Sequence, residues 1–173
     1  MQRRQQQRGS SMVEFTLAGV AAIFILISTF QLAIGMWNYH TLAYAAHEAS
    51  RYAAVHGYGC TEPGNTCSIY VSDIAHKFKT SAIGVPDSQV IVTLTTDSGA
   101  ATSCNPLNTC YSGASATTVW PPSANNDNFV GRKIKVSAIY HFTNAMAFLW
   151  PGARKVAFGQ VWLPASSTQT ILF

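Results

Sequence analysis

Residues 15–36 read FTLAGVAAIFILISTFQLAIGM, and this stretch decides how the chain is organised. It contains no Asp, Glu, Lys, Arg or His. As an α-helix it would extend about 33 Å, close to the thickness of the hydrocarbon core of a bilayer. We therefore predict a membrane-spanning helix at about residues 15–36, followed by Trp37 and Tyr39 in the outer aromatic belt.

A cleaved secretory signal is the alternative interpretation of this segment. Ala33 and Gly35 are small enough for a signal peptidase, and the arginines before the run would form the basic region of such a signal. The apolar run is longer than the roughly 7 to 15 residues of a typical signal, which favours a retained anchor.

Charge is concentrated before the apolar run. Lys and Arg number 11 against 7 Asp and Glu, a net charge of +4, and three of the cations are Arg3, Arg4 and Arg8. Without residues 1–9 the net charge is +1, so we expect no nucleic-acid partner. The positive-inside rule places the N-terminus in the cytoplasm and the residues beyond about 40 on the exported side.

Glu14 lies at the start of the apolar run, where an unpaired carboxylate costs roughly a few kcal/mol if it enters hydrocarbon. If the chain is cut after Gly9, Ser10 carries a new α-ammonium group four residues before Glu14. This amine can pair with Glu14 within one chain or between neighbouring copies. The alternative is that Glu14 is an interfacial acid, stabilised by the helix dipole and by the hydroxyls of Ser10 and Ser11.

Two stretches of the sequence resemble a known family. Residues 8–15, RGSSMVEF, resemble the RGxxxVEF start of the TadE-like minor pseudopilins of the tight-adherence (Flp) pilus system, which carry a class III signal peptide. Residues 44–54, YAAHEASRYAA, resemble the helical stretch xAAxEGARYAA of the same family. The resemblance is strongest over residues 8–57.

The resemblance implies a minor pilin or pseudopilin that is cleaved between Gly9 and Ser10 by a prepilin peptidase and retains its helix. Such a subunit acts in the initiation or capping of a Tad/Flp-type pilus for adherence. Arg3, Arg4 and Arg8 would set the topology, and Glu14 would register the subunit by pairing with an N-terminal amine.

Partners and location are implied in the same way. The partners are the prepilin peptidase, the major pilin, other minor pseudopilins and the inner-membrane pilus assembly platform. The protein would cross the bacterial inner membrane once, with its N-terminus in the cytoplasm and its C-terminal domain in the periplasm or outside the cell, or would be incorporated in the pilus. A signal-anchored cell-surface or periplasmic binding module is the alternative function.

The helix is expected to continue beyond the membrane. Residues 37–56 contain no Pro or Gly, and their apolar residues recur at steps of three and four, which indicates an amphipathic exported half. Gly57 would end the helix. We therefore predict a basic leader at residues 1–9, a long helix at 10–56 and an exported domain at 57–173.

The exported domain is predicted to be α+β, with the long helix packed on a small antiparallel sheet. Alternation of apolar residues indicates strands at 90–95 and 134–142, and Val156, Phe158 and Trp162 indicate a third strand ended by Pro164. A short amphipathic helix is expected at residues 69–82. Residues 97–128 are rich in Ser, Asn, Gly, Pro and Thr and are predicted to form a long loop.

Four cysteines follow the membrane segment, on the side where disulfides form: Cys60, Cys67, Cys104 and Cys110. Their spacings do not match those of zinc sites. We favour the local pairs Cys60–Cys67 and Cys104–Cys110, and cross-pairing remains open.

The sequence contains no established catalytic motif. G-x-S-x-G, P-loop, Rossmann and zincin patterns are absent, and the acids and histidines of the exported domain are scattered. We expect no enzymatic activity, no metal and no cofactor. The apolar run AMAFLW at residues 145–150 is either part of the core or a patch that contacts a subunit or the membrane.

Overall fold

The computed structural model describes residues 3–57, 60, 67, 69–143 and 160–172, with side chains described from residue 11 onward. It divides the chain into two compact units, one containing residues up to Met36 and the other beginning at Trp37. The apolar run at 145–150 and the predicted strand residues Val156 and Phe158 lie outside the described residues.

Helix α1 (Arg3–Ala54) is continuous over 52 residues and contributes to both units. It begins earlier than predicted, because Arg and Gln favour helix and one interior Gly costs only about 1 kcal/mol. It ends two residues before His56. Nδ1 of His56 lies 2.6 Å from the carbonyl oxygen of Tyr52, so the side chain satisfies one of the last open carbonyls of the helix.

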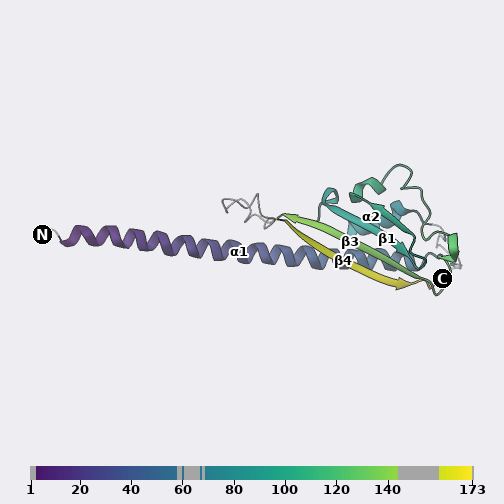
Figure 1. The fold of residues 1–173 in the computed structure, drawn as a ribbon, viewed down its shortest axis with the longest axis horizontal. Helices are drawn as coiled ribbons and strands as arrows, with labels where there is room; N and C mark the ends of the chain where they lie inside the picture. The colour runs from purple at the N-terminus through teal and green to yellow at the C-terminus, as the bar shows by residue number, and fades with distance from the viewer. Residues whose placement is uncertain (1–2, 58–59, 61–66, 68, 144–159, 173) are drawn as a thin grey trace. The chain divides into compact units, whose positions relative to one another are not determined.

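The second unit contains a four-stranded antiparallel sheet and a second helix, α2 (Val71–Ser81). The sheet order is β2-β1-β3-β4, and Figure 1 shows β1, β3 and β4 side by side. Its strands are β1 (Val90–Thr96), β2 (Ala101–Cys104), β3 (Lys133–Thr143) and β4 (Gln160–Thr170). The predicted α+β class, with a long helix and a small antiparallel sheet, is confirmed.

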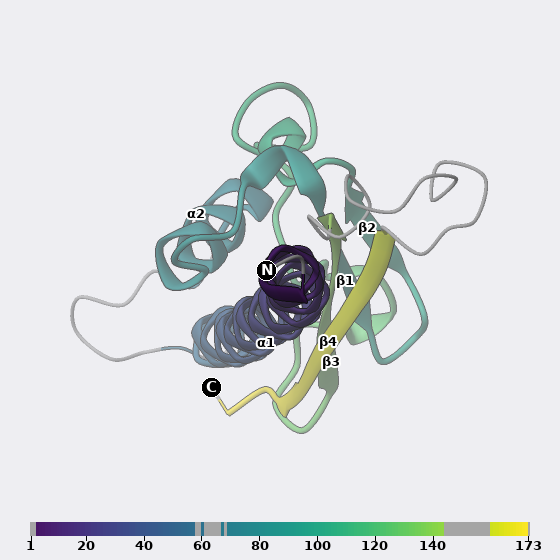
Figure 2. The same cartoon turned by 90° about the vertical axis from the view of Figure 1, so that its left-hand side faces the viewer.

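One face of this sheet is buried and the other is open. Alternate residues of β1 and β3 point into the core, including Val92 and Leu94 of β1 and Val136 and Ala138 of β3. Within the second unit, α2 and the residues of α1 from Trp37 onward cover that same face (Figure 2). The opposite face therefore carries the partly exposed residues of each strand.

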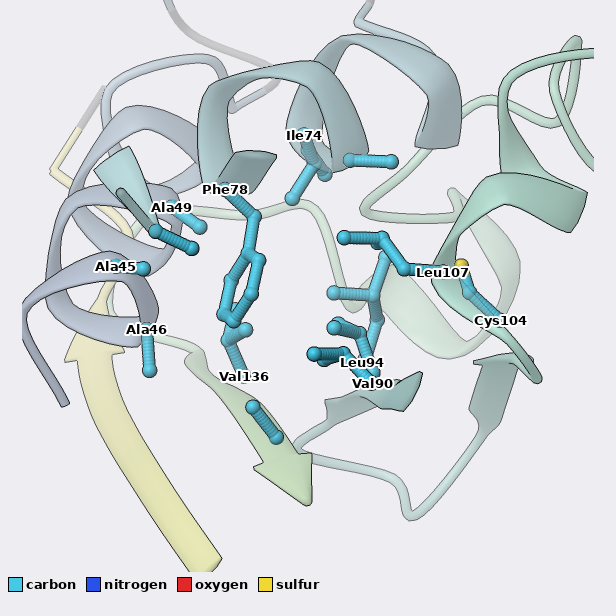
Figure 3. Packing of buried hydrophobic residues seen from close by; sticks show 14 of the residues in the cluster. Ala45, Ala46, Ala49, Ile74, Phe78, Val90, Leu94, Cys104, Leu107 and Val136 are labelled. Atoms are coloured by element: carbon cyan, nitrogen blue, oxygen red, sulfur yellow. The ribbon is translucent and has the colours of Figure 1, made fainter. Parts of the chain in front are cut away.

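Small side chains let α1 approach the sheet closely. Ala45, Ala46 and Ala49 are fully buried, as is Phe78 of α2. Figure 3 shows the Phe78 ring between these alanines and Val136 of β3. An aromatic ring thus fills the space that the alanines leave, which is how cores reach their packing density.

The prediction of a long loop over residues 97–128 was wrong. This segment contains β2 and two short 3₁₀-helices, Leu107–Cys110 and Ala124–Asn126. Leu107 and Trp120 anchor it in the core, and the Trp120 amide donates to the Ile69 carbonyl oxygen at 3.0 Å. The segment is held in place by a few buried side chains, and it has no regular alternation of apolar residues from which its structure could be predicted.

The predicted end of the last strand was also wrong. Pro164 lies inside β4 and pairs in register with Ile139 of β3. β4 is an edge strand, where a residue without a backbone N–H is tolerated because one side of the strand has no ladder partner.

Candidate functional site

The predicted processing and pairing residues lie on the first turns of α1. Arg3, Arg4, Arg8, Gly9 and Ser10 are all within the helix, and their side chains are outside the described part of the structure. Glu14 follows one turn later, and its side chain is exposed. The helix therefore places the backbone of Ser10 four residues before Glu14, on one face.

The side chains of α1 between residues 11 and 36 are not covered by the rest of the protein. None of them is buried, and Met12, Phe15 and Leu17 are each at least 74% exposed. An apolar surface of this size is not stable in water and requires lipid or other apolar helices.

Polar groups within this surface are satisfied by the helix itself. The hydroxyls of Thr16, Ser28 and Thr29 donate to the carbonyl oxygens four residues earlier, at 2.8, 2.7 and 2.9 Å. An α-helix also pairs its own backbone N–H and C=O groups, which is necessary in the hydrocarbon core of a bilayer because no water is present there. The segment can therefore enter a bilayer without leaving these hydroxyls unpaired.

The part of α1 from Trp37 onward presents small residues and one hydroxyl to the sheet. Ser50 is fully buried, and its hydroxyl donates to the carbonyl oxygen of His47 at 2.9 Å. The Ser50 hydroxyl also lies 2.8 Å from the hydroxyl of Ser167 on β4. This contact ties α1 directly to the edge strand, and sequence reasoning missed it because nothing in the pattern places residues 50 and 167 together.

A half-exposed polar cluster joins α2 to the segment that follows it. Asp87 accepts hydrogen bonds from Lys79 Nζ at 2.6 Å and from the Tyr111 hydroxyl at 2.9 Å. Burial opposes ionisation of Asp87, but these two bonds outweigh it and lower the pKa of Asp87. His76 stacks on Tyr111, with ring centroids 4.6 Å apart. Lys79 and Asp87 are thus paired with each other, and the cluster connects α2 to the segment that follows it.

A buried carboxylate holds the turn between β1 and β2. Asp127 is 1% exposed and accepts hydrogen bonds from the Ser98 hydroxyl and, at 3.1 Å, from the Ser98 backbone N–H. Burial raises the pKa of Asp127, but the bonds from Ser98 and Thr96 and the nearby Arg132 outweigh burial, so the net effect is a lowered pKa. Sequence reasoning gave Asp127 no role because it lies in a stretch read as loop.

The four cysteines form two local pairs. The Cα atoms of Cys60 and Cys67 are 5.3 Å apart, and those of Cys104 and Cys110 are 5.5 Å apart, with the sulfurs of each pair at bonding distance. These are the two pairs that the sequence favoured. The second pair joins the end of β2 to the 3₁₀-helix that follows it.

Over the described residues, no group of three or more His, Cys, Asp and Glu side chains could hold a metal ion. One described helix, α1, is long and apolar enough to cross a membrane, which makes it a candidate anchor. The functional surface that the structure offers is thus the N-terminal helix.

Residues 9–51 match the model of the TadE-like protein family. The resemblance seen in the sequence is confirmed over this segment, which contains Gly9, Ser10, Glu14, the apolar run and Ser50. The match supports involvement in the Tad pilus system, and the candidate anchor is consistent with membrane association. The chain matches no curated protein and no solved structure.

The TadE-like segment contains both the uncovered apolar surface and the alanine face that packs on the sheet. The remaining elements of the second unit, from α2 to β4, lie outside the matched residues. The family match therefore lies within α1 and does not extend to the sheet.

Proposed function

We propose that this chain is a minor pseudopilin subunit that acts in the initiation or capping of a Tad/Flp-type pilus for adherence. The observation that carries the proposal is the uncovered apolar surface of α1, residues 11–36, within a segment that matches the TadE-like family. Pilus subunits bury such helices first in the membrane and then against one another.

In this proposal, a prepilin peptidase cleaves the chain between Gly9 and Ser10. Arg3, Arg4 and Arg8 hold the leader in the cytoplasm until cleavage. The new amine of Ser10 and the carboxylate of Glu14 lie one turn apart, so pairing them, within a subunit or between subunits, neutralises both charges in an apolar bundle. Glu14 thereby registers one subunit against its neighbour.

The partners follow from the same role: the prepilin peptidase, the major pilin, other minor pseudopilins and the inner-membrane assembly platform. The mature protein crosses the inner membrane once with its C-terminal domain exported, and it can enter the pilus. Its action is mechanical, and the proposal requires no enzymatic step and no cofactor.

Processing in cells that contain the native peptidase tests the proposal. We expect Gly9→Leu to retain residues 1–9 and to form no pili, because a bulky side chain blocks the cut site. Gly19→Ala is the matched control for processing alone, since position 19 lies in the same helix ten residues beyond the cut site and nothing in the chain lies within 4 Å of a Cβ there. Normal maturation of Gly9→Leu, read from intact mass, would contradict the proposed cut site.

A further inference from the structure

The open face of the sheet carries an aromatic group at one end of strands β3 and β4. His141 pairs in register with Trp162, and Ile139 pairs with Pro164. The rings of His141 and Trp162 pack with centroids 4.6 Å apart, and the Trp162 side chain is still 57% exposed. Within the second unit, α2 and the described part of α1 cover the opposite face (Figure 2). The indole ring is therefore supported by a neighbouring ring and accessible from solvent.

A row of hydroxyl groups crosses all four strands beside this aromatic group. The strand register places Ser103, Thr93, Ser137 and Ser166 next to one another on β2, β1, β3 and β4. None of these four residues is buried, and the hydroxyls of Thr93 and Ser103 lie 3.5 Å apart. Each hydroxyl can donate and accept hydrogen bonds. The row can therefore bind the hydroxyl groups of a ligand that lies flat on the sheet.

Two lysines continue the same face beyond the hydroxyl row. Lys135 follows two residues before Ser137 on β3, Lys133 lies two residues before Lys135, and both lysines are exposed. The four described strands contain no Asp or Glu. The carboxylate of Asp97, which follows β1, is paired with Arg132 at 3.1 Å. This end of the face is therefore cationic, and its charge complements an anionic ligand.

The three zones together match the chemistry of an acidic polysaccharide. Lys135 and His141 are six strand residues apart, or about 20 Å, so one linear polymer can reach both ends of the face. The C–H face of a sugar ring packs on an indole, sugar hydroxyls bond to Ser and Thr, and carboxylate or sulfate groups pair with lysines. Two lysines are few for a nucleic acid, whose binding depends on the neutralisation of many phosphates.

We propose that the open face of the sheet binds an acidic polysaccharide along β3 and β4. One sugar ring lies on Trp162, sugar hydroxyls bond to the row that contains Ser137, and acidic groups pair with Lys133 and Lys135. Every residue that carries this inference lies within the second unit. The inference goes beyond the proposed function, because it assigns a ligand to the sheet and requires neither processing nor assembly of the chain.

Isothermal titration of the full chain in a neutral detergent tests the inference. The probes are alginate, which carries carboxylates, dextran sulfate, which carries sulfates, and unmodified dextran as the neutral polymer. Trp162→Ala removes the exposed ring, and the double change Lys133→Gln and Lys135→Gln removes the charges. The matched controls are Tyr44→Ala on α1 and Lys77→Gln on α2, because these helices cover the other face of the sheet.

We expect alginate or dextran sulfate to bind more tightly than dextran, with an affinity that falls as salt is added. Trp162→Ala and the double lysine change should each weaken this binding about three- to tenfold. Trp162→Phe should retain most of the affinity because it keeps an aromatic ring, and both control variants should bind like the wild type. Thermal unfolding of each variant reports whether it is folded.

Failure of both anionic polymers to bind would overturn the inference, and so would equal binding of dextran. Wild-type affinity in both Trp162→Ala and the double lysine variant would also overturn it. Tighter binding of single-stranded DNA than of either polysaccharide would identify a nucleic-acid surface instead. These results are independent of cleavage between Gly9 and Ser10, which is measured by intact mass, so the two proposals can fail separately.

Discussion

Asp127 is a buried carboxylate whose contacts all serve the fold. It joins the turn at Ser98 to a segment 29 residues further along the chain, and Arg132 lies near enough to favour its ionised form. Because its hydrogen bonds and the nearby Arg132 compensate for burial, the charge of Asp127 stabilises the second unit.

This arrangement predicts a pH dependence. The pKa of Asp127 is lowered in the folded state, so its contribution is present above the unfolded pKa of about 3.9 and is lost as the pH falls through the folded value. Asp127→Asn should lower the free energy of unfolding at pH 7 by about 1.5 to 3 kcal/mol, and the difference should shrink below about pH 4. Urea unfolding of the full chain in detergent, followed by near-UV circular dichroism, measures both.

Asp97→Asn is the matched control for this prediction. Asp97 pairs with Arg132 at 3.1 Å, but both side chains are more than a third exposed, so we expect a loss of at most about 1 kcal/mol. Equal stability of the Asp127→Asn and wild-type proteins at pH 7 would show that the buried carboxylate does not hold the turn.

Glu14 is the residue on which the proposed assembly depends. Glu14→Ala should be processed normally, because the cut site is unchanged, but should form fewer pili. Loss of one charge pair worth about 1.4 kcal/mol corresponds to roughly a tenfold reduction. Immunoblots of processing and counts of surface pili separate the two effects. Glu14→Gln tests the charge itself, and wild-type pilus numbers in either variant would rule out the registering role.

At the scale of elements, α1 consists of two successive segments with different surroundings. Up to Met36 its apolar side chains are exposed, whereas beyond it small residues such as Ala45 and Ala49 are buried against the sheet. Ser50 is fully buried, and its hydroxyl contacts the hydroxyl of Ser167 on β4. The edge strand is therefore attached to the helix as well as to β3.

A double-mutant cycle measures this attachment. Ser50→Ala and Ser167→Ala should each lower the stability of the second unit by about 0.5 to 1.5 kcal/mol. The double variant should lose less than the sum of the two, because each single change already removes the contact. Hydrogen exchange of the β4 amides reports the loss locally. Strict additivity would mean that the two hydroxyls do not interact.

How much of these elements could be predicted depends on how regular their pattern is. The apolar run and the alternation in β1 and β3 identified the long helix and two strands, because each repeats one period over many residues. β2 was missed because four residues, ATSC, carry no period, and β4 was cut short because Pro164 is normally a terminator. On the candidate site, the leader residues are predicted from a local motif and stay a prediction, whereas the contact between Ser50 and Ser167 required the tertiary structure.

At the scale of the whole molecule, the two disulfides differ in access. Cys104 and Cys110 are each 1% exposed, whereas Cys67 is exposed. Mild reductant under native conditions should therefore reduce Cys60–Cys67 first and leave Cys104–Cys110 intact until the second unit unfolds. Mass spectrometry of alkylated peptides distinguishes the pairs. Equal rates of reduction in the native protein would contradict the burial of the second pair.

The central claim is that the chain is a pilin-like subunit whose leader is removed and whose helix is retained. The most direct measurement is the N-terminal sequence and intact mass of the mature protein, expressed with its native peptidase. The account predicts a mature chain that begins at Ser10 and retains residues 15–36. A chain that begins near Met36, or one that retains residues 1–9, would contradict it.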